Sequence, residues 1–94
     1  MITAIFSHRV ANFDKWLTEF DNHAEFRKNA GSTGATVYQA ADDPNKVTVV
    51  SNFASMEQFS AFAEAPELKE KMESAGVLEE PTVSVLTQSG RYAA

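Results

Sequence analysis

The sequence predicts an α+β domain whose strands and helices follow in the order β-α-β-β-α-β. Three observations support this prediction. Residues 2–10 alternate with a period of two, residues 13–29 carry apolar side chains at helical spacing, and the turn-forming run "ADDPN" separates two β-rich segments. Because 94 residues leave room for only one hydrophobic core, we expect a single domain over residues 1–94.

The first strand is expected over residues 2–10, "ITAIFSHRV". One of its faces is apolar except for His8, since side chains two residues apart point the same way. The other face includes Ile5 and mixes polar with apolar residues. That mixture is unusual both for a face in water and for a hydrophobic core.

The first helix is expected to begin after Asn12, a typical N-cap, and to end near Asn29. Gly31 then offers a left-handed stop.

This helix carries two basic side chains on or beside its apolar stripe. At roughly 100° per residue, Arg27 falls inside the stripe, and His23 lies at its edge on the side of Trp16. Phe26 points away from the stripe, which predicts either an exposed ring or a contact with another subunit.

Residues 35–40 and 46–53 are predicted strands, which the turn at 41–45 joins into a hairpin. A capping box at Ser55 and Gln58 opens the second helix.

The second helix is expected to restart at Pro66 and to end at Gly76, before a last strand at 82–87. The resulting pattern is the split βαβ, ferredoxin-like fold, with four antiparallel strands and two helices on one face. Ile5 and Val50 leave apolar groups on the face without helices. A second copy would bury them, so we expect a homodimer, with the tail frayed or in contact with the partner.

Composition excludes several classes of function. A net charge of −5 argues against nucleic acid or an anionic membrane surface as a partner. The absence of cysteine excludes disulfides, thiol catalysis and cysteine-based zinc sites. The first residues do not resemble a signal peptide, and no apolar run reaches the ~20 residues of a membrane span. We therefore expect a cytoplasmic protein.

Two long segments resemble a known family. They are "HRVANFDKWLTEFDNHAEFRKNAG" and "DDPNKVTVVSNFASMEQFSAFAEAPELKEKMESAGV". They are similar to the dimeric α+β barrel superfamily, and within it to small bacterial proteins grouped with the antibiotic biosynthesis monooxygenase domain. The resemblance runs from about Ile2 to Leu86, and its landmarks include His8, Trp16 and Arg27.

The resemblance implies a dimer whose two sheets pack face to face, with a ligand pocket between helices and sheet in each subunit. Some relatives oxidise polycyclic phenols with dioxygen and no cofactor. Others degrade haem, isomerise or decarboxylate small molecules, or have no known activity. The haem degraders place a histidine ligand on the second helical half, whereas the only histidines here are His8 and His23. We therefore expect neither haem, nor another cofactor, nor a metal.

A candidate site follows from these placements, because an apolar pocket with a few directed polar groups is typical of small-molecule sites. The expected catalytic residues are His8 and His23. The expected ligand-binding residues are Trp16, Arg27, Tyr38, Ser51 and Phe53. In this interpretation a histidine takes a proton from the ligand, Arg27 holds an anionic or phenolate oxygen, and Trp16 stacks on a flat ring.

A structural interpretation of the same residues stays open. The histidines then fill polar gaps, the tryptophan packs in the core, and Arg27 pairs with a carboxylate such as Glu19 or Glu80. The expected function is cofactor-independent oxygenation of an aromatic, phenolic or carboxylate-bearing molecule by a homodimeric oxidoreductase. The alternatives are a non-catalytic ligand-binding or structural dimer and a cofactor-free isomerase or cyclase.

Overall fold

The structure, a computed structural model, describes residues 1–94. The strands are β1 (Ile2–Arg9), β2 (Ser32–Ala40), β3 (Asp43–Phe53) and β4 (Thr82–Thr87). The helices are α1 (Phe13–Asn22), α2 (Ala24–Asn29), α3 (Met56–Glu64) and α4 (Pro66–Ser74). The predicted order β-α-β-β-α-β is confirmed, with each predicted helix divided into two.

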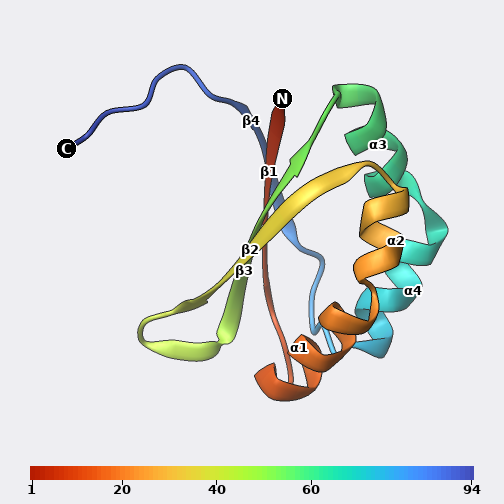
Figure 1. Cartoon of the computed structure of the whole chain (residues 1–94). Helices are drawn as coiled ribbons and strands as arrows, with labels where there is room; N and C mark the ends of the chain where they lie inside the picture. The colour runs from red at the N-terminus through yellow and green to blue at the C-terminus, as the bar shows by residue number, and fades with distance from the viewer.

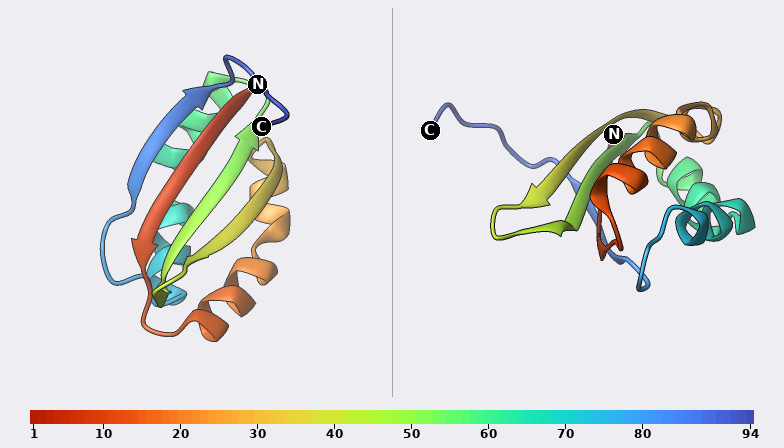
Figure 2. Two further views of the ribbon diagram at one scale, coloured as in Figure 1. Left: turned by 90° about the vertical axis from the view of Figure 1, so that its left-hand side faces the viewer. Right: turned by 90° about the horizontal axis from the view of Figure 1, so that it is seen from below.

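The four strands form one antiparallel sheet in the order β2-β3-β1-β4, and all the helices cover the same face (Figures 1 and 2). This is the predicted ferredoxin-like α+β fold. The central strands β1 and β3 run beside each other along their whole length, from the pair Ile2–Phe53 to the pair Arg9–Lys46. The dimeric barrel stays a prediction.

The core lies between the two central strands and the helices. Its buried apolar residues are Ala4, Phe6, Val10, Trp16, Val47, Val49, Phe53, Phe59, Phe62 and Ala75. Only 12 of the 94 residues are buried, so the core is small for the length of the chain.

The predicted helix starts and stops are confirmed in detail. The Asn12 side chain accepts a hydrogen bond from the Lys15 backbone N–H at 3.0 Å, and the Ser55 hydroxyl accepts one from the Gln58 N–H at 3.2 Å. Gly31 has φ 98° and follows α2. Glycine meets no steric penalty in this left-handed region, which explains its use as a stop.

The first predicted helix breaks at His23. The His23 N–H donates to the Glu19 and Phe20 carbonyl oxygens at 3.1 and 3.2 Å, and its φ and ψ of −98° and 16° leave the helical range. The chain then begins a new helix, α2, whose side chains do not continue the faces of α1. The prediction for Phe26 is wrong for this reason: its half-buried ring packs on Phe62 of the same chain, with ring centroids 5.7 Å apart.

The face of the sheet opposite the helices is uncovered (Figure 2). Ile5 pairs with Val50 on this face, and the Leu86 side chain, 46% exposed, lies on the same face of β4. After β4 the tail runs away from the helices (Figure 1), with Tyr92 exposed. No helix has the length and apolar character needed to cross a membrane. The cytoplasmic location stays a prediction.

Candidate functional site

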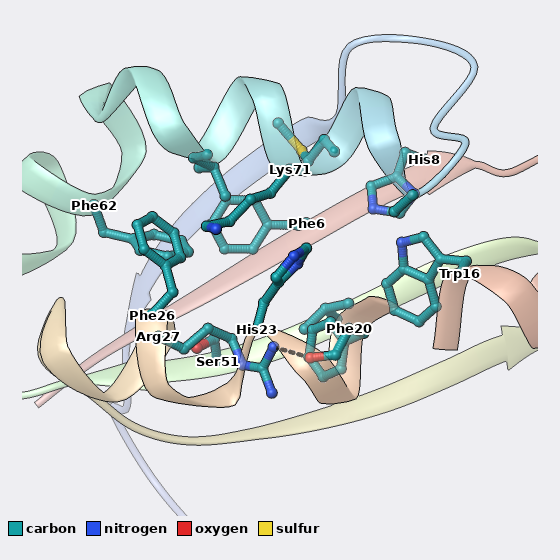
Figure 3. A pocket seen from close by; sticks show the side chains of 14 residues that line it. Phe6, His8, Trp16, Phe20, His23, Phe26, Arg27, Ser51, Phe62 and Lys71 are labelled. Atoms are coloured by element: carbon teal, nitrogen blue, oxygen red, sulfur yellow. Dashed lines mark hydrogen bonds between the residues drawn. The ribbon is translucent and has the colours of Figure 1, made fainter. Parts of the chain in front are cut away.

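A cavity of about 90 Å³ lies between the sheet and the helices (Figure 3). The sheet contributes Phe6, His8, Val49 and Ser51. Helices α1 and α2 and their junction contribute Trp16, Phe20, His23, Phe26 and Arg27. Helices α3 and α4 and the residue after them contribute Phe62, Leu68, Lys71, Met72 and Ala75. The sheet residues are buried, whereas His23, Arg27, Lys71 and Met72 are half-buried and border the opening.

His8 lies deepest among the titratable groups. The alternation of β1 points its ring to the helix side, where it is 3% exposed and packs edge-on against Trp16 at 5.7 Å. Its Nδ1 atom is buried and has no hydrogen-bond partner. Burial lowers the pKa of His8, and Lys46 lowers it further, against the raising effects of a backbone hydrogen bond and of Glu79. In its neutral form the imidazole has one acceptor nitrogen, which is suited to receive a proton or a hydrogen bond.

Trp16 forms an aromatic wall with its neighbours on α1. Its ring stacks on Phe20 at 4.9 Å and lies 5.9 Å from Phe13, and the residue is 4% exposed. Stacked rings of this kind contribute packing energy, and Trp16 and Phe20 both line the cavity.

Arg27 on α2 contacts Phe20 on α1 and so connects the two helices across the break. Its Nη1 donates a hydrogen bond to the Phe20 carbonyl oxygen, and its guanidinium lies 3.6 Å from the centroid of the Phe20 ring. No carboxylate lies within ion-pair distance, so the expected alternative pairing with Glu19 or Glu80 is not formed. Burial lowers the pKa of Arg27, and the charge of Asp21 opposes this shift.

His23 occupies the junction itself and faces the cavity mouth (Figure 3). Its Nε2 atom lies 3.9 Å from the Glu19 carboxylate, and its side chain is 22% exposed. Burial lowers the pKa of His23, the charges of Lys71 and Arg27 lower it further, and Glu19 raises it. Like His8, it is therefore neutral near pH 7.

Ser51 borders the cavity, but its hydroxyl is engaged within the sheet. The hydroxyl donates to the Gly34 carbonyl oxygen at 3.3 Å and lies within hydrogen-bond distance, 3.1 Å, of the Ser32 hydroxyl. Because the hydroxyl is engaged in these contacts, Ser51 contributes to the cavity as part of its wall and not as a proton donor.

Tyr38 and Phe53 do not line the cavity. Tyr38 pairs with Thr48, whose hydroxyl lies 3.2 Å from that of Ser7 on the uncovered face, and its side chain is 55% exposed there. Phe53 is fully buried against Phe59, 5.5 Å away, and belongs to the core. The expected pocket walls at these two positions are therefore corrected, at Tyr38 by the register of the hairpin and at Phe53 by its burial in the core.

Sequence reasoning missed Lys71. Its Nζ atom lies 5.0 Å from the centroid of the Phe26 ring, and the residue borders the cavity. A signal was present: Leu68, Lys71, Met72 and Ala75 follow the spacing i, i+3, i+4, i+7, which places them on one helix face.

A second, larger cavity of about 540 Å³ lies between the α3–α4 region and residues 77–83. Its charged lining residues are Glu64, Lys69, Glu73, Glu79 and Glu80. All five are exposed, so their charges are solvated, and none of the expected site residues borders this cavity. The smaller cavity, with its buried polar atoms, is therefore the candidate site.

No group of three or more His, Asp or Glu side chains is arranged to hold a metal ion. That no metal or cofactor takes part stays a prediction.

Comparisons with known proteins agree with this architecture. The family described as antibiotic biosynthesis monooxygenase matches residues 1–74. No curated protein matches the chain in sequence.

Several solved structures share the fold. A candidate antibiotic biosynthesis monooxygenase from Bordetella bronchiseptica has a TM-score of 0.79 at 16% identity, over 93% of this chain and 95% of that one. SnoaB, a cofactor-independent oxygenase from Streptomyces nogalater, has a TM-score of 0.79 at 13% identity, over 99% and 97%. The ActVA-Orf6 monooxygenase of Streptomyces coelicolor, in complex with nanaomycin D, has a TM-score of 0.72 at 16% identity, over 99% and 91%. At these identities the likeness shows the fold alone.

Proposed function

Because the chain belongs to the antibiotic biosynthesis monooxygenase family, we propose that it is a cofactor-independent monooxygenase acting on a small aromatic or phenolic compound. The observation that carries the proposal is an aromatic cavity lined by His8, whose buried Nδ1 atom has no hydrogen-bond partner. SnoaB is a cofactor-independent oxygenase of the same fold, which gives the proposal a precedent.

The proposed first step is proton transfer from the ligand to His8. Neutral His8 offers an acceptor, and burial favours its neutral form. A phenol hydroxyl that hydrogen bonds to this atom fills its vacant position and then loses its proton to it. Trp16 and Phe20 stack along the ligand ring and exclude water. The phenolate so formed is electron-rich, which is the property that dioxygen needs in a reductant.

The proposed chemistry balances without a cofactor. The phenolate transfers an electron to dioxygen, and a carbon–oxygen bond forms between a ring carbon and the reduced oxygen to give a hydroperoxide. The oxygen–oxygen bond then breaks as the proton on that carbon leaves. One oxygen atom remains in a quinone carbonyl and the other departs as water, so the substrate supplies all four electrons. His23, at the mouth, is the second proposed acid–base group, and Arg27 and Ser51 shape the wall.

Proteins of this family are commonly dimeric, and we propose a dimer here through the uncovered face of the sheet. Ile5, Val50 and Leu86 give that face its apolar groups. Burial of such groups against a second sheet stabilises a chain whose own core is small.

The size of the cavity favours a second candidate, a non-catalytic dimer. About 90 Å³ is less than the roughly 150 Å³ of an apolar cavity that accepts benzene. Under the monooxygenase proposal, half-buried side chains at the mouth, such as Met72 and Lys71, must therefore move to admit a ring. Under the second candidate they stay in place.

Oxygen uptake separates the candidates. Purified protein is mixed with a panel of phenols, hydroquinones and hydroxylated polycyclic aromatics, with protein-free autoxidation as the background. The monooxygenase proposal predicts uptake that is saturable in one panel member and lost in His8→Phe. Conversion of a ligand at equal rate without dioxygen would indicate an isomerase or cyclase, and absence of both binding and uptake would favour the non-catalytic dimer.

A further inference from the structure

We infer that Lys71 forms an anion-binding subsite at the mouth of the cavity, so that the ligand is a hydroxyaromatic compound that also carries a carboxylate. The inference rests on the proposed function in that it concerns the same cavity. It adds the charge of the ligand and the residue that recognises it.

The first support is the charge of the cavity lining. Every titratable side chain that borders it is basic: His8, His23, Arg27 and Lys71. No acidic residue lines the cavity although the chain carries a net charge of −5, and the Glu19 carboxylate, 3.9 Å from His23 Nε2, lies outside the lining. Because both histidines are neutral near pH 7, the positive charge of the lining comes from Arg27 and Lys71, and it is complementary to an anion.

The second support is that Lys71 has no internal partner. Arg27 donates to the Phe20 carbonyl oxygen and covers the Phe20 ring, so its contacts hold the α1–α2 junction. Lys71 forms no ion pair or hydrogen bond, and its Nζ atom lies 5.0 Å from the Phe26 ring centroid. Since the residue is half-buried, an incoming carboxylate would gain a charge-assisted contact at little cost of desolvation.

The third support is a second unsatisfied group in the same cavity. His8 is 3% exposed, and its Nδ1 atom has no partner. Figure 3 shows His8 beside Trp16 at one end of the cavity, and Lys71 near Phe26 and Phe62 toward the other. A ring with a hydroxyl at one end and a carboxylate at the other meets both groups. In this arrangement His8 hydrogen bonds to the hydroxyl of the ligand and Lys71 binds its carboxylate.

The test uses a reference probe and two further probes, each of which differs from the reference in one group. They are para-hydroxybenzoate, the uncharged para-hydroxybenzamide, and benzoate, which lacks the hydroxyl. Binding is followed by ¹H–¹⁵N NMR through the indole N–H of Trp16, the single tryptophan of the chain. Spectra of each variant also report whether it is folded.

We expect para-hydroxybenzoate to bind wild type about tenfold more tightly than the amide. Lys71→Gln removes this preference and leaves the amide unchanged, and Lys71→Arg restores it. Lys69→Gln is the matched control, because Lys69 lies on the same helix, is exposed and does not border the cavity.

Two results would overturn the inference in distinguishable ways. If acid and amide bind equally, or if the preference for the acid survives in Lys71→Gln, the anion subsite is wrong while the cavity remains a ligand site. If none of the probes shifts the Trp16 signal at high concentration, the ligand site fails, and the proposed function fails with it.

Discussion

His8 combines two properties that oppose each other in a folded protein: it is buried, and one of its ring nitrogens lacks a partner. An unsatisfied buried polar atom costs about 1–3 kcal/mol, so an apolar residue of similar shape would fit the fold at least as well. The sequence has histidine here, and under the proposed function the ligand supplies the missing hydrogen bond.

We predict that His8→Phe keeps or raises the free energy of unfolding at pH 7.5, by up to about 2 kcal/mol, while it abolishes turnover. Urea denaturation and oxygen uptake measure the two effects. A loss of stability above 1 kcal/mol together with intact turnover would show that the histidine serves the fold.

The lowered pKa of His8 predicts a pH dependence of stability. Above about pH 6.5 the imidazole is neutral in both folded and unfolded chains. As the pH falls below this value, the unfolded chain takes up a proton that the buried ring, which faces Lys46 and Glu79, resists. The contribution of His8 to the free energy of unfolding is therefore fully present above about pH 6.5 and is lost as the pH falls toward 5.

Urea midpoints of wild type and His8→Phe between pH 8 and 5 test this dependence. The decline should be shallower in the variant, and what remains belongs mainly to His23, whose pKa is lowered in the same direction. Equal declines in the two proteins would contradict the assignment to His8.

At the level of elements, the break between α1 and α2 determines which side chains reach the cavity. The apolar spacing of the first helix predicts one continuous helix, because periodicity reports which face is buried and not where the backbone turns. The break at His23 brings Phe26 inward onto Phe62. Arg27 then donates a second hydrogen bond to the Phe20 carbonyl oxygen, which at the break also accepts from the His23 N–H.

We predict that Arg27→Met lowers the free energy of unfolding by about 1–3 kcal/mol, since the Phe20 carbonyl oxygen loses a charged donor. Thermal and urea denaturation measure the change. Lys28→Met, at an exposed neighbouring position on α2, should stay within about 0.5 kcal/mol of wild type. Similar losses in both variants would mean that the Phe20 contact contributes nothing specific.

The strands show which part of the site the sequence could predict. The alternation in β1 correctly places His8 on the helix side, because period two needs only one strand. The face of the sheet on which Tyr38 lies could be predicted only with the register of the hairpin. Its face depends on its pairing with Thr48, and irregularities near Ser32 and Gln39 shift that pairing in ways that turn residues alone do not specify. Lys71 could not be placed from the sequence with the same ease, because the acidic residues around it at 64–73 are typical of a solvated helix face.

At the scale of the whole molecule, the uncovered sheet face and the small core point to a partner. The fold class could be predicted because strand and helix periods, caps and turn residues all agree. Assembly depends on a surface whose partner is outside the chain, so it remains a proposal.

We predict that wild type is a dimer and that Val50→Lys, in the middle of the uncovered face, makes it a monomer. Light scattering after gel filtration reports the mass. Thr18→Lys, an exposed position on α1, is the matched control and should remain a dimer. A monomeric wild type, or a dimeric Val50→Lys, would contradict assembly through the sheet.

Under the proposed function, the chain inserts oxygen into an aromatic ligand without a cofactor. This can be measured by mass spectrometry of the product formed under ¹⁸O₂ by protein shown to be free of metal and flavin. We expect a product that contains one ¹⁸O atom, formed by wild type and not by His8→Phe. A product that carries oxygen only from water, or one formed equally without dioxygen, would rule out oxygen insertion by this protein.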